Sequence, residues 1–428
     1  MTTSPARQAI ARRMLELRRT LRGAAHRVEY FHQVDDPYCQ LVAPLLERMI
    51  ERYEVELVPV LVGPPDDKAA PERAHLVAYS RKDTSAIAPY YGTEFPDPGE
   101  QPPAQLVTLA NAILAANMEA EQFAVLAAAV GDALWARDAA ALTLLGEEYG
   151  ATDPDTVERA IEGGNEHREK LGHYLGATFH YAGEWYWGIE RLVYLEDRLE
   201  DLGASRDAGV ARLVERHIPD ARPAVRDPKE LALEFYPSLR SPYTAISFEP
   251  VGALIRNYGV ELVLRPVLPM VMRGLPVPPS KSRYIVKDTK REAERAGISF
   301  GVVADPVGRP VELGYSLYAH ACEQGKGFEF LHAFAHLAFA AGVDLGEEAG
   351  LKQACERAGL DWSEARPYLG NEDWRELLEA NRLALLDSGL WGVPSFRLLG
   401  PGGVELLATW GQDRVWLVEQ KIQEYLAG

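Results

Sequence analysis

Thiol groups are scarce in this sequence, which has 3 cysteines in 428 residues. A protein built on disulfide bonds needs more cysteines, so we expect the chain to fold in a reducing compartment, the cytoplasm. Apolar runs of about 20 residues, the length of a membrane-spanning helix, are also missing, so we expect no membrane partner. The glycine-rich loops that bind phosphates and the G-x-S-x-G motif of many hydrolases do not occur either.

Basic residues are too few for a nucleic-acid-binding protein. The sequence has 45 Lys and Arg against 63 Asp and Glu, a formal net charge of −18. Binding to phosphate backbones needs a net basic surface, so we expect no nucleic acid partner. With 47% hydrophobic and 25% charged residues, the composition is that of an ordinary folded protein, and the length predicts two or three domains.

The first 27 residues differ from the rest because they are rich in arginine. The arginines are Arg7, Arg12, Arg13, Arg18, Arg19, Arg22 and Arg27. The apolar residues among them form no continuous stretch of signal-peptide length. We therefore expect a basic surface helix within residues 1–27, with an organellar targeting helix as the alternative interpretation.

Part of the sequence recurs 205 positions later. The matching segments are Glu29-Tyr30-Phe31 with Glu234-Phe235-Tyr236, Asp36-Pro37-Tyr38-Cys39 with Ser241-Pro242-Tyr243-Thr244, Val55-Glu56-Leu57-Val58 with Val260-Glu261-Leu262-Val263, and Tyr79 with Tyr284. Further along, the offset changes, and the matches are Gly176-Ala177-Thr178-Phe179 with Gly392-Val393-Pro394-Ser395, and Gly188-Ile189-Glu190-Arg191-Leu192 with Gly411-Gln412-Asp413-Arg414-Val415. A period this long predicts a duplicated domain. We place the copies at residues 28–205 and 230–428, with a proline-containing linker at 206–229.

Each copy has the same predicted order of elements. A strand, a proline-containing helix and a second strand come first, with strands at 28–34 and 55–62 in one copy and at 231–236 and 260–268 in the other. A helical block follows, around 104–148 and 311–389, and each copy ends in two short strands and a helix. The predicted fold class is therefore α/β, with two thioredoxin-like folds that each contain a helical subdomain.

Five motifs of the second copy, in this order, resemble a known family. They are Ser241-Pro242-Tyr243, Arg265-Pro266, the set Lys281, Tyr284, Asp288 and Arg291, then Gly392-Val393-Pro394, and Gly411-Gln412-Asp413-Arg414. They are similar to the DsbA-like thioredoxin proteins, in the branch of 2-hydroxychromene-2-carboxylate isomerase and the kappa-class glutathione transferases. The first copy matches this pattern more weakly.

The resemblance implies a glutathione site in the second copy. Ser241 is expected to hold the glutathione sulfur at a helix start, where thiol pKa values fall. It also implies that Pro394 follows a cis bond, that Val393 and Pro394 hold the peptide, and that Gln412 and Asp413 meet the γ-glutamyl end. The simpler interpretation of Ser241 is a helix N-cap, and that of Asp413 is an acid that complements the helix dipole.

The helical spacing of a further set predicts one shared polar face, which the resemblance places at the substrate cleft. The set is Lys281, Tyr284, Asp288 and Arg291, and Tyr243 joins the cleft by resemblance. A solvated, salt-bridged surface is the alternative. The glutathione-using relatives carry an Asn in the loop before this helix, and residues 269–283 contain none.

The first copy differs at the positions that matter for chemistry. Asp36 replaces Ser241, and a carboxylate repels a thiolate and has no hydrogen to donate. Thr178 is aligned with Pro394. We therefore expect this copy to be degenerate. Cys39 lacks the second thiol that dithiol exchange needs, and it is expected to be a buried small residue.

These observations favour a glutathione-dependent isomerase or transferase that acts on an aromatic or electrophilic carbonyl compound. A non-catalytic thioredoxin-like protein that binds a ligand or peptide is the alternative, and a thiol–disulfide oxidoreductase is more distant. We expect no metal site, because His332 and His336 lack a third ligand. By resemblance to dimeric single-copy relatives, we expect a monomer in which the two copies pack as a pseudo-dimer.

Overall fold

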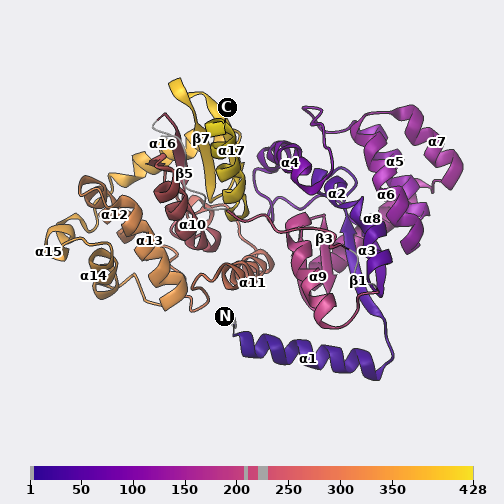
Figure 1. The fold of residues 1–428 in the computed structure, drawn as a ribbon, viewed down its shortest axis with the longest axis horizontal. Coiled ribbons are helices and arrows are strands. Elements are labelled where there is room, and N and C mark those ends of the chain that lie inside the picture. Colours follow the sequence, from indigo (N-terminus) through magenta and orange to yellow (C-terminus); the bar gives the residue numbers. More distant parts are fainter. Residues whose placement is uncertain (1–3, 207–210, 220–229, 428) are drawn as a thin grey trace. The chain divides into compact units, whose positions relative to one another are not determined.

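The computed structural model describes residues 4–206, 211–219 and 230–427. It divides into two compact units, an N-terminal unit from Pro5 to Arg216 and a C-terminal unit from His217 onward. Each unit contains one four-stranded sheet with helices packed around it (Figure 1). The residues 220–229 of the predicted linker, with Pro223 and Pro228, lie outside the described residues.

The sheet of the N-terminal unit has the strand order β2-β1-β3-β4. The strands are β1 (His26–His32), β2 (Val55–Leu61), β3 (Thr178–Tyr181) and β4 (Glu184–Trp187). The helices are α1 (Pro5–Leu21), α2 (Pro37–Val42), α3 (Leu45–Arg52), α4 (Arg73–Ile87), α5 (Ala104–Ala116), α6 (Ala120–Trp135), α7 (Ala139–Tyr149), α8 (Pro154–Leu171) and α9 (Leu192–Asp201). The first predicted helix ends early, at Val42, because Pro44 interrupts it before α3 begins.

The sheet of the C-terminal unit has the matching order β6-β5-β7-β8. Its strands are β5 (Ala232–Tyr236), β6 (Glu261–Leu264), β7 (Ser395–Leu399) and β8 (Glu405–Trp410). Its helices are α10 (Pro242–Tyr258), α11 (Pro279–Ala296), α12 (Arg309–Glu323), α13 (Gly327–His336), α14 (Glu348–Arg357), α15 (Trp362–Ala365), α16 (Trp374–Asp387) and α17 (Val415–Ala427). Within the described residues, no helix is both long and apolar enough to span a membrane.

Both sheets combine one parallel pair with an antiparallel hairpin, as in a thioredoxin fold. In the parallel pairs Tyr30 faces Pro59 and Phe235 faces Leu264, so the register is the same in both units. Along the chain, the helices α5 to α8 come between β2 and β3, and the helices α12 to α16 come between β6 and β7. The predicted fold class, two thioredoxin-like folds with helical insertions, is confirmed.

The sheet register corrects one predicted match between the two copies. Thr178 pairs with Phe31 and Ser395 pairs with Tyr236, and Phe31 and Tyr236 are themselves equivalent. Thr178 therefore corresponds to Ser395, and Ala177 corresponds to Pro394. The alignment of Thr178 with Pro394 was wrong by one residue, because the helical insertions differ in length and only the register with the first strand sets the correspondence.

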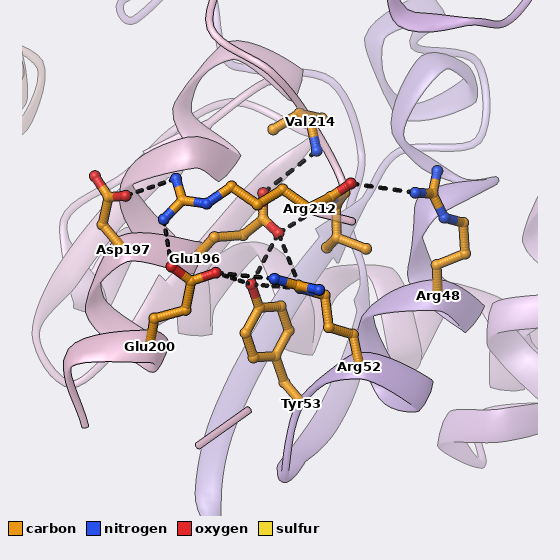
Figure 2. A network of polar contacts seen from close by, with 9 residues as sticks. Arg48, Arg52, Tyr53, Glu196, Asp197, Glu200, Arg212 and Val214 are labelled. Atoms are coloured by element: carbon orange, nitrogen blue, oxygen red, sulfur yellow. Dashed lines mark hydrogen bonds and ion pairs between the residues drawn. The ribbon is translucent and has the colours of Figure 1, made fainter. Parts of the chain in front are cut away.

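A buried carboxylate attaches the segment after α9 to the N-terminal unit (Figure 2). Glu196 on α9 is fully buried, and its carboxylate accepts hydrogen bonds from Tyr53 Oη at 2.8 Å and from the backbone nitrogens of Leu213 and Val214 at 2.8 and 3.3 Å. Leu213 and Val214 are buried too. Residues 211–216, which fall in the predicted linker, therefore pack on α9 and α3.

Charged side chains extend this network at its edge. Arg52 lies 3.0 Å from Glu200 and 3.7 Å from Glu196, and Arg212 forms ion pairs with Asp197 and Glu200 (Figure 2). Burial raises the pKa of Glu196, while the hydrogen bonds from Leu213 and Tyr53 lower it. The buried carboxylate is thus stabilised by donors from three segments of the chain.

Candidate functional site

Ser241 lies at the N-cap of α10, where its hydroxyl oxygen accepts a hydrogen bond from the backbone nitrogen of Thr244 at 3.2 Å. The same hydroxyl faces the carbonyl oxygen of Val393 at 3.4 Å. That distance is longer than a normal O–H···O hydrogen bond. The side chain is partly exposed, so its hydrogen can turn to a stronger acceptor that reaches the site from solvent.

The loop before β7 lies next to Ser241. The bond between Val393 and Pro394 is cis, as the resemblance implies. The carbonyl oxygen of Pro394 accepts a hydrogen bond from the Gly411 nitrogen at 3.0 Å. Gly411 has a φ of +123°, a conformation that favours glycine. These contacts place the start of the last helical segment directly beside the Val393-Pro394 loop.

Gln412 and Asp413 follow Gly411 and are partly exposed. The Gln412 amide donates to the carboxylate of Glu292 on α11 at 3.0 Å. The Asp413 carboxylate turns back over Gly411, where a Cβ would overlap with it, and it lies 3.5 Å from the Arg414 guanidinium. The structure thus brings the partly exposed Ser241, Val393, Gln412 and Asp413 close together around the buried Pro394.

A buried lysine lies next to this region. Lys281, at the start of α11, has its ammonium 5.5 Å from the centroid of the Trp391 ring, and Trp391 precedes Val393 by two residues. Burial lowers the pKa of Lys281 to about 8. A cation that is largely removed from water favours negative charge in its surroundings. Trp391 was not among the predicted site residues, although it directly precedes the motif Gly392-Val393-Pro394.

The other predicted cleft residues differ in exposure. Tyr284 and Asp288 are buried on α11, as Lys281 is, whereas Arg291 is partly exposed. The alternative of a fully solvated face is therefore wrong for the buried members. Tyr243 donates a hydrogen bond to Asp288 at 2.8 Å, which joins α10 to α11.

The equivalent contacts of the N-terminal unit separate fold from chemistry. Tyr38 donates to Asp83 at 2.7 Å, as Tyr243 does to Asp288, so this contact belongs to the architecture that both units share. Glu190 likewise lies close to Gly188, as Asp413 does to Gly411. One difference between the units is the pair of residues at the start of the first helix and in the loop before the third strand. The pair is Ser241 with Val393 in the C-terminal unit and Asp36 with Gly176 in the N-terminal unit.

Cys39 acts as a hydrogen-bond acceptor inside the N-terminal unit. Its sulfur accepts hydrogen bonds from the backbone N–H groups of Gln33 at 3.2 Å and Ala177 at 3.0 Å. The hydroxyl oxygen of the equivalent Thr244 accepts one from the Ser238 N–H group at 3.3 Å. Cys39 is fully buried, and burial together with the nearby Asp36 raises the pKa of its thiol well above the usual range. These contacts match the prediction of a buried small residue.

The two remaining cysteines lie in the helical insertion of the C-terminal unit, Cys322 on α12 and Cys355 on α14. The two positions of the paired thiols in redox relatives are occupied by Ser241 and Thr244. Among the described residues, no group of three or more His, Cys, Asp or Glu side chains is arranged as a metal site. His332 instead stacks on Phe248, and burial lowers its pKa to about 4.

Comparison with known protein families gives one match, which lies in the C-terminal unit. The sequence model of the DSBA-like thioredoxin domain matches residues 232–423. No curated protein sequence matches the chain significantly.

Among solved structures, the chain resembles 2-hydroxychromene-2-carboxylate isomerase, with 19% identity, coverage of 45% of this chain and 95% of that chain, and a TM-score of 0.37. It also resembles the cytosolic disulfide reductase DsbM from Pseudomonas aeruginosa, with 20% identity, coverage of 46% and 99%, and a TM-score of 0.36. For the same reductase with GSH, the identity is 17%, the coverage is 45% of this chain and 99% of that chain, and the TM-score is 0.32. Residues 232–423 of this chain are a DsbA-like thioredoxin domain.

Proposed function

We propose that the C-terminal unit binds glutathione and uses its thiol in an isomerisation or transfer reaction on an electrophilic carbonyl compound. The observation that carries this proposal is the Ser241 hydroxyl, which is partly exposed. Its oxygen accepts a hydrogen bond from the Thr244 nitrogen, but its hydrogen has only a long contact, 3.4 Å, to the Val393 carbonyl. A hydroxyl held in this way is ready to donate its hydrogen to a thiolate. The two positions of the C-terminal unit at which a dithiol would lie hold Ser241 and Thr244, so under this proposal the sulfur comes with the ligand.

The chemistry follows from an ionised sulfur at Ser241. The glutathione thiol loses its proton to solvent, and the thiolate adds to the electron-poor carbon of a carbon–carbon double bond conjugated with the carbonyl. A carbon–sulfur bond forms, and the π electrons of the double bond move onto the carbonyl oxygen as an enolate. In an isomerisation, rotation about the former double bond follows, the enolate re-forms the double bond, and the thiolate is expelled. In a transfer, the enolate carbon takes a proton from solvent, the carbon–sulfur bond persists, and the product leaves as a thioether.

Two charged side chains near the Val393-Pro394 loop and the last helix support a ligand that carries charges of both signs. Glutathione carries two carboxylates and one ammonium. The buried ammonium of Lys281 lies beside Trp391, close in sequence to the Val393-Pro394 loop, and favours negative charge nearby. Asp413 is partly exposed at the other end of the region and suits the γ-glutamyl ammonium.

A second candidate function is ligand binding without catalysis. It is favoured by the absence of Asn from residues 269–283 and by the burial of Tyr284 and Asp288, which leaves few polar groups to act on a substrate. Thiol–disulfide exchange is disfavoured, since it needs paired thiols and the positions hold Ser241 and Thr244.

Calorimetric titration of glutathione tests the proposal. We expect binding to the wild-type chain and at least about tenfold weaker binding to Ser241→Ala. Asp36→Ser is the matched control, because it changes the equivalent position of the other unit and should leave the affinity unchanged. Absence of binding to the wild type at millimolar glutathione contradicts the proposal. A peptide or metabolite that raises the melting temperature in its place supports the non-catalytic alternative.

A further inference from the structure

The N-terminal unit contains a cavity of about 200 Å³ next to Asp36. Asp35, Asp36 and Arg73 contribute charged groups to its lining, and Leu76, Leu175 and Trp187 contribute apolar surface. Pro37 and Tyr38 of α2 also line it. The unit predicted to be degenerate therefore retains a hollow with both polar and apolar lining, and it is larger than the cavity of about 150 Å³ that binds benzene in another protein.

The Asp36 side chain lines this cavity. Its Oδ1 atom accepts a hydrogen bond from the Tyr38 nitrogen at 3.0 Å. Its Oδ2 atom is 3.9 Å from the Cys39 sulfur, a distance at which a thiol donates only weakly. The residue is partly exposed. These two contacts leave acceptor positions of the carboxyl unused, so it can accept a further hydrogen bond from a donor in the cavity.

Gly176 makes room for this carboxyl. A Cβ at Gly176 would lie 2.9 Å from Asp36 Oδ2, 2.9 Å from Gln33 Cβ and 3.2 Å from Cys39 Sγ, closer than side-chain carbons normally approach. The C-terminal unit has the opposite combination, the small Ser241 with the larger Val393. The two positions are matched in size within each unit, as expected if Asp36 belongs to an adapted site and not to a decayed one.

We propose that this cavity binds a small amine with an apolar body, with the ammonium at Asp35 and Asp36 and the body against Leu76, Leu175 and Trp187. The proposal is independent of the function proposed for Ser241. An ammonium gains charge-assisted hydrogen bonds from both carboxyl groups, and the apolar wall removes the body of the molecule from water. The cavity thus selects for charge of one sign at one end.

The charges around Asp36 favour a cation over an anion. The titratable or charged groups near it are Asp35, Cys39, Tyr30, Arg73 and Arg168. Arg73 donates to the Pro65 carbonyl at 2.6 Å and lies 3.7 Å from the Asp67 carboxylate, which offsets its charge. Arg168 donates to Asn165 at 2.9 Å; its charge lowers the pKa of Asp36, which favours the carboxylate form, and its side chain does not line the cavity. An anionic ligand would instead meet the carboxylates of Asp35 and Asp36.

The affinity should depend on pH through Asp36. Burial, and then the charge of Asp35, raise the pKa of Asp36 to about 7. Below that pH the carboxyl is mainly neutral and attracts an ammonium weakly, whereas above it the carboxylate is available. Binding of an amine is therefore expected to strengthen several-fold from about pH 6 to about pH 8.

The test uses phenethylamine as the probe and hydrocinnamate, which has the same ring and chain but a negative charge, as the control. Calorimetry should show binding of phenethylamine to the wild type and none of hydrocinnamate. Asp36→Asn keeps a good N-cap residue and should weaken the amine at least about tenfold at about pH 8 and remove the pH dependence. Asp35→Asn should weaken binding but keep the pH dependence, with its midpoint moved to lower pH.

Three results would overturn the proposal: no binding of phenethylamine to the wild type at millimolar concentration, equal binding of hydrocinnamate, or an Asp36→Asn variant that binds like the wild type. Ser241→Ala separates this site from the other unit. Unchanged phenethylamine affinity in Ser241→Ala supports the N-terminal site, and loss of binding in that variant contradicts it.

Discussion

Tyr243 donates a hydrogen bond of 2.8 Å to Asp288, and the equivalent Tyr38 donates one of 2.7 Å to Asp83. Each bond ties the helix after the first strand to the helix after the second strand. Since this tyrosine–aspartate pair occurs in both units, we attribute it to the stability of the fold. Its presence in both units does not by itself indicate a catalytic site.

Replacement of either tyrosine should therefore cost stability to a similar extent. Tyr243→Phe and Tyr38→Phe each remove one hydrogen-bond donor to a buried carboxylate, which we expect to lower the free energy of unfolding by about 1–3 kcal/mol. Urea unfolding followed by circular dichroism measures both effects. A Tyr243→Phe variant of unchanged stability that no longer binds glutathione would instead assign Tyr243 to the ligand site.

Cys39 should be inert as a thiol but required for stability. Cys39→Ala leaves the nitrogens of Gln33 and Ala177 without their acceptor and is expected to cost about 1–3 kcal/mol, whereas Cys39→Ser keeps an acceptor and should cost less. Under native conditions a thiol reagent should modify the exposed Cys322 and leave the buried Cys39 and Cys355 unmodified. Rapid modification of Cys39, or reduction of insulin that depends on it, would contradict this role.

Lys281 predicts a specific dependence of stability on pH. Burial lowers its pKa in the folded chain to about 8, against about 10.4 in an unfolded chain. Between these values the unfolded state binds more protons, so the stability should rise with pH from about 8 to about 10.4. The cost of burying the charge is fully present below about pH 8.

Lys281→Met should remove both the free-energy cost of burying the ammonium and the pH dependence of stability that this cost causes. At neutral pH we expect the variant to be more stable by about 1–3 kcal/mol and, if the ammonium attracts the ligand, to bind glutathione more weakly. Melting temperatures measured across this pH range check the first point, with the surface variant Lys287→Met as the control. A less stable Lys281→Met protein at neutral pH would show that the contacts of the ammonium outweigh its burial.

Glu196 should hold the segment 211–216 in place. Glu196→Ala removes an acceptor shared by Tyr53, Leu213 and Val214 and leaves these donors buried, with an expected cost of about 2–4 kcal/mol. Glu196→Gln keeps the size and one acceptor oxygen and should cost less. Limited trypsin digestion reports the local effect, because cleavage after Arg212 should accelerate more in Glu196→Ala than in Glu196→Gln. Equal cleavage rates in all three proteins would disprove the anchoring role.

The order of elements was predictable because it depends on local pattern. The repeat from Glu29 to Tyr79 keeps one offset, since no insertion separates its strands and helices. The register of Tyr30 with Pro59 and of Phe235 with Leu264 agrees with it. Beyond the helical insertions the offset depends on loop lengths, so Thr178 was matched one residue away from its true counterpart. Common descent of the two copies stays a prediction.

The candidate site was predictable as a set of positions but not as an environment. Motif order indicated Ser241, Pro394 and Asp413, and the structure brings them together. Burial of Lys281 against Trp391 depends on packing between α11 and the loop before β7, which no spacing reveals. The position of the Asp36 carboxyl beside the cavity depends on the missing Cβ of Gly176, a contact between residues 140 positions apart.

The ionisation of bound glutathione tests most directly whether Ser241 stabilises a thiolate. Ultraviolet absorbance of the thiolate, followed against pH with saturating protein, gives the thiol pKa in the complex. For the wild type we predict a value at least about one unit below the roughly 8.5 of a free thiol, and for Ser241→Ala a return toward the free value. An unshifted pKa in the wild-type complex, or an equal shift in Ser241→Ala, would contradict the account.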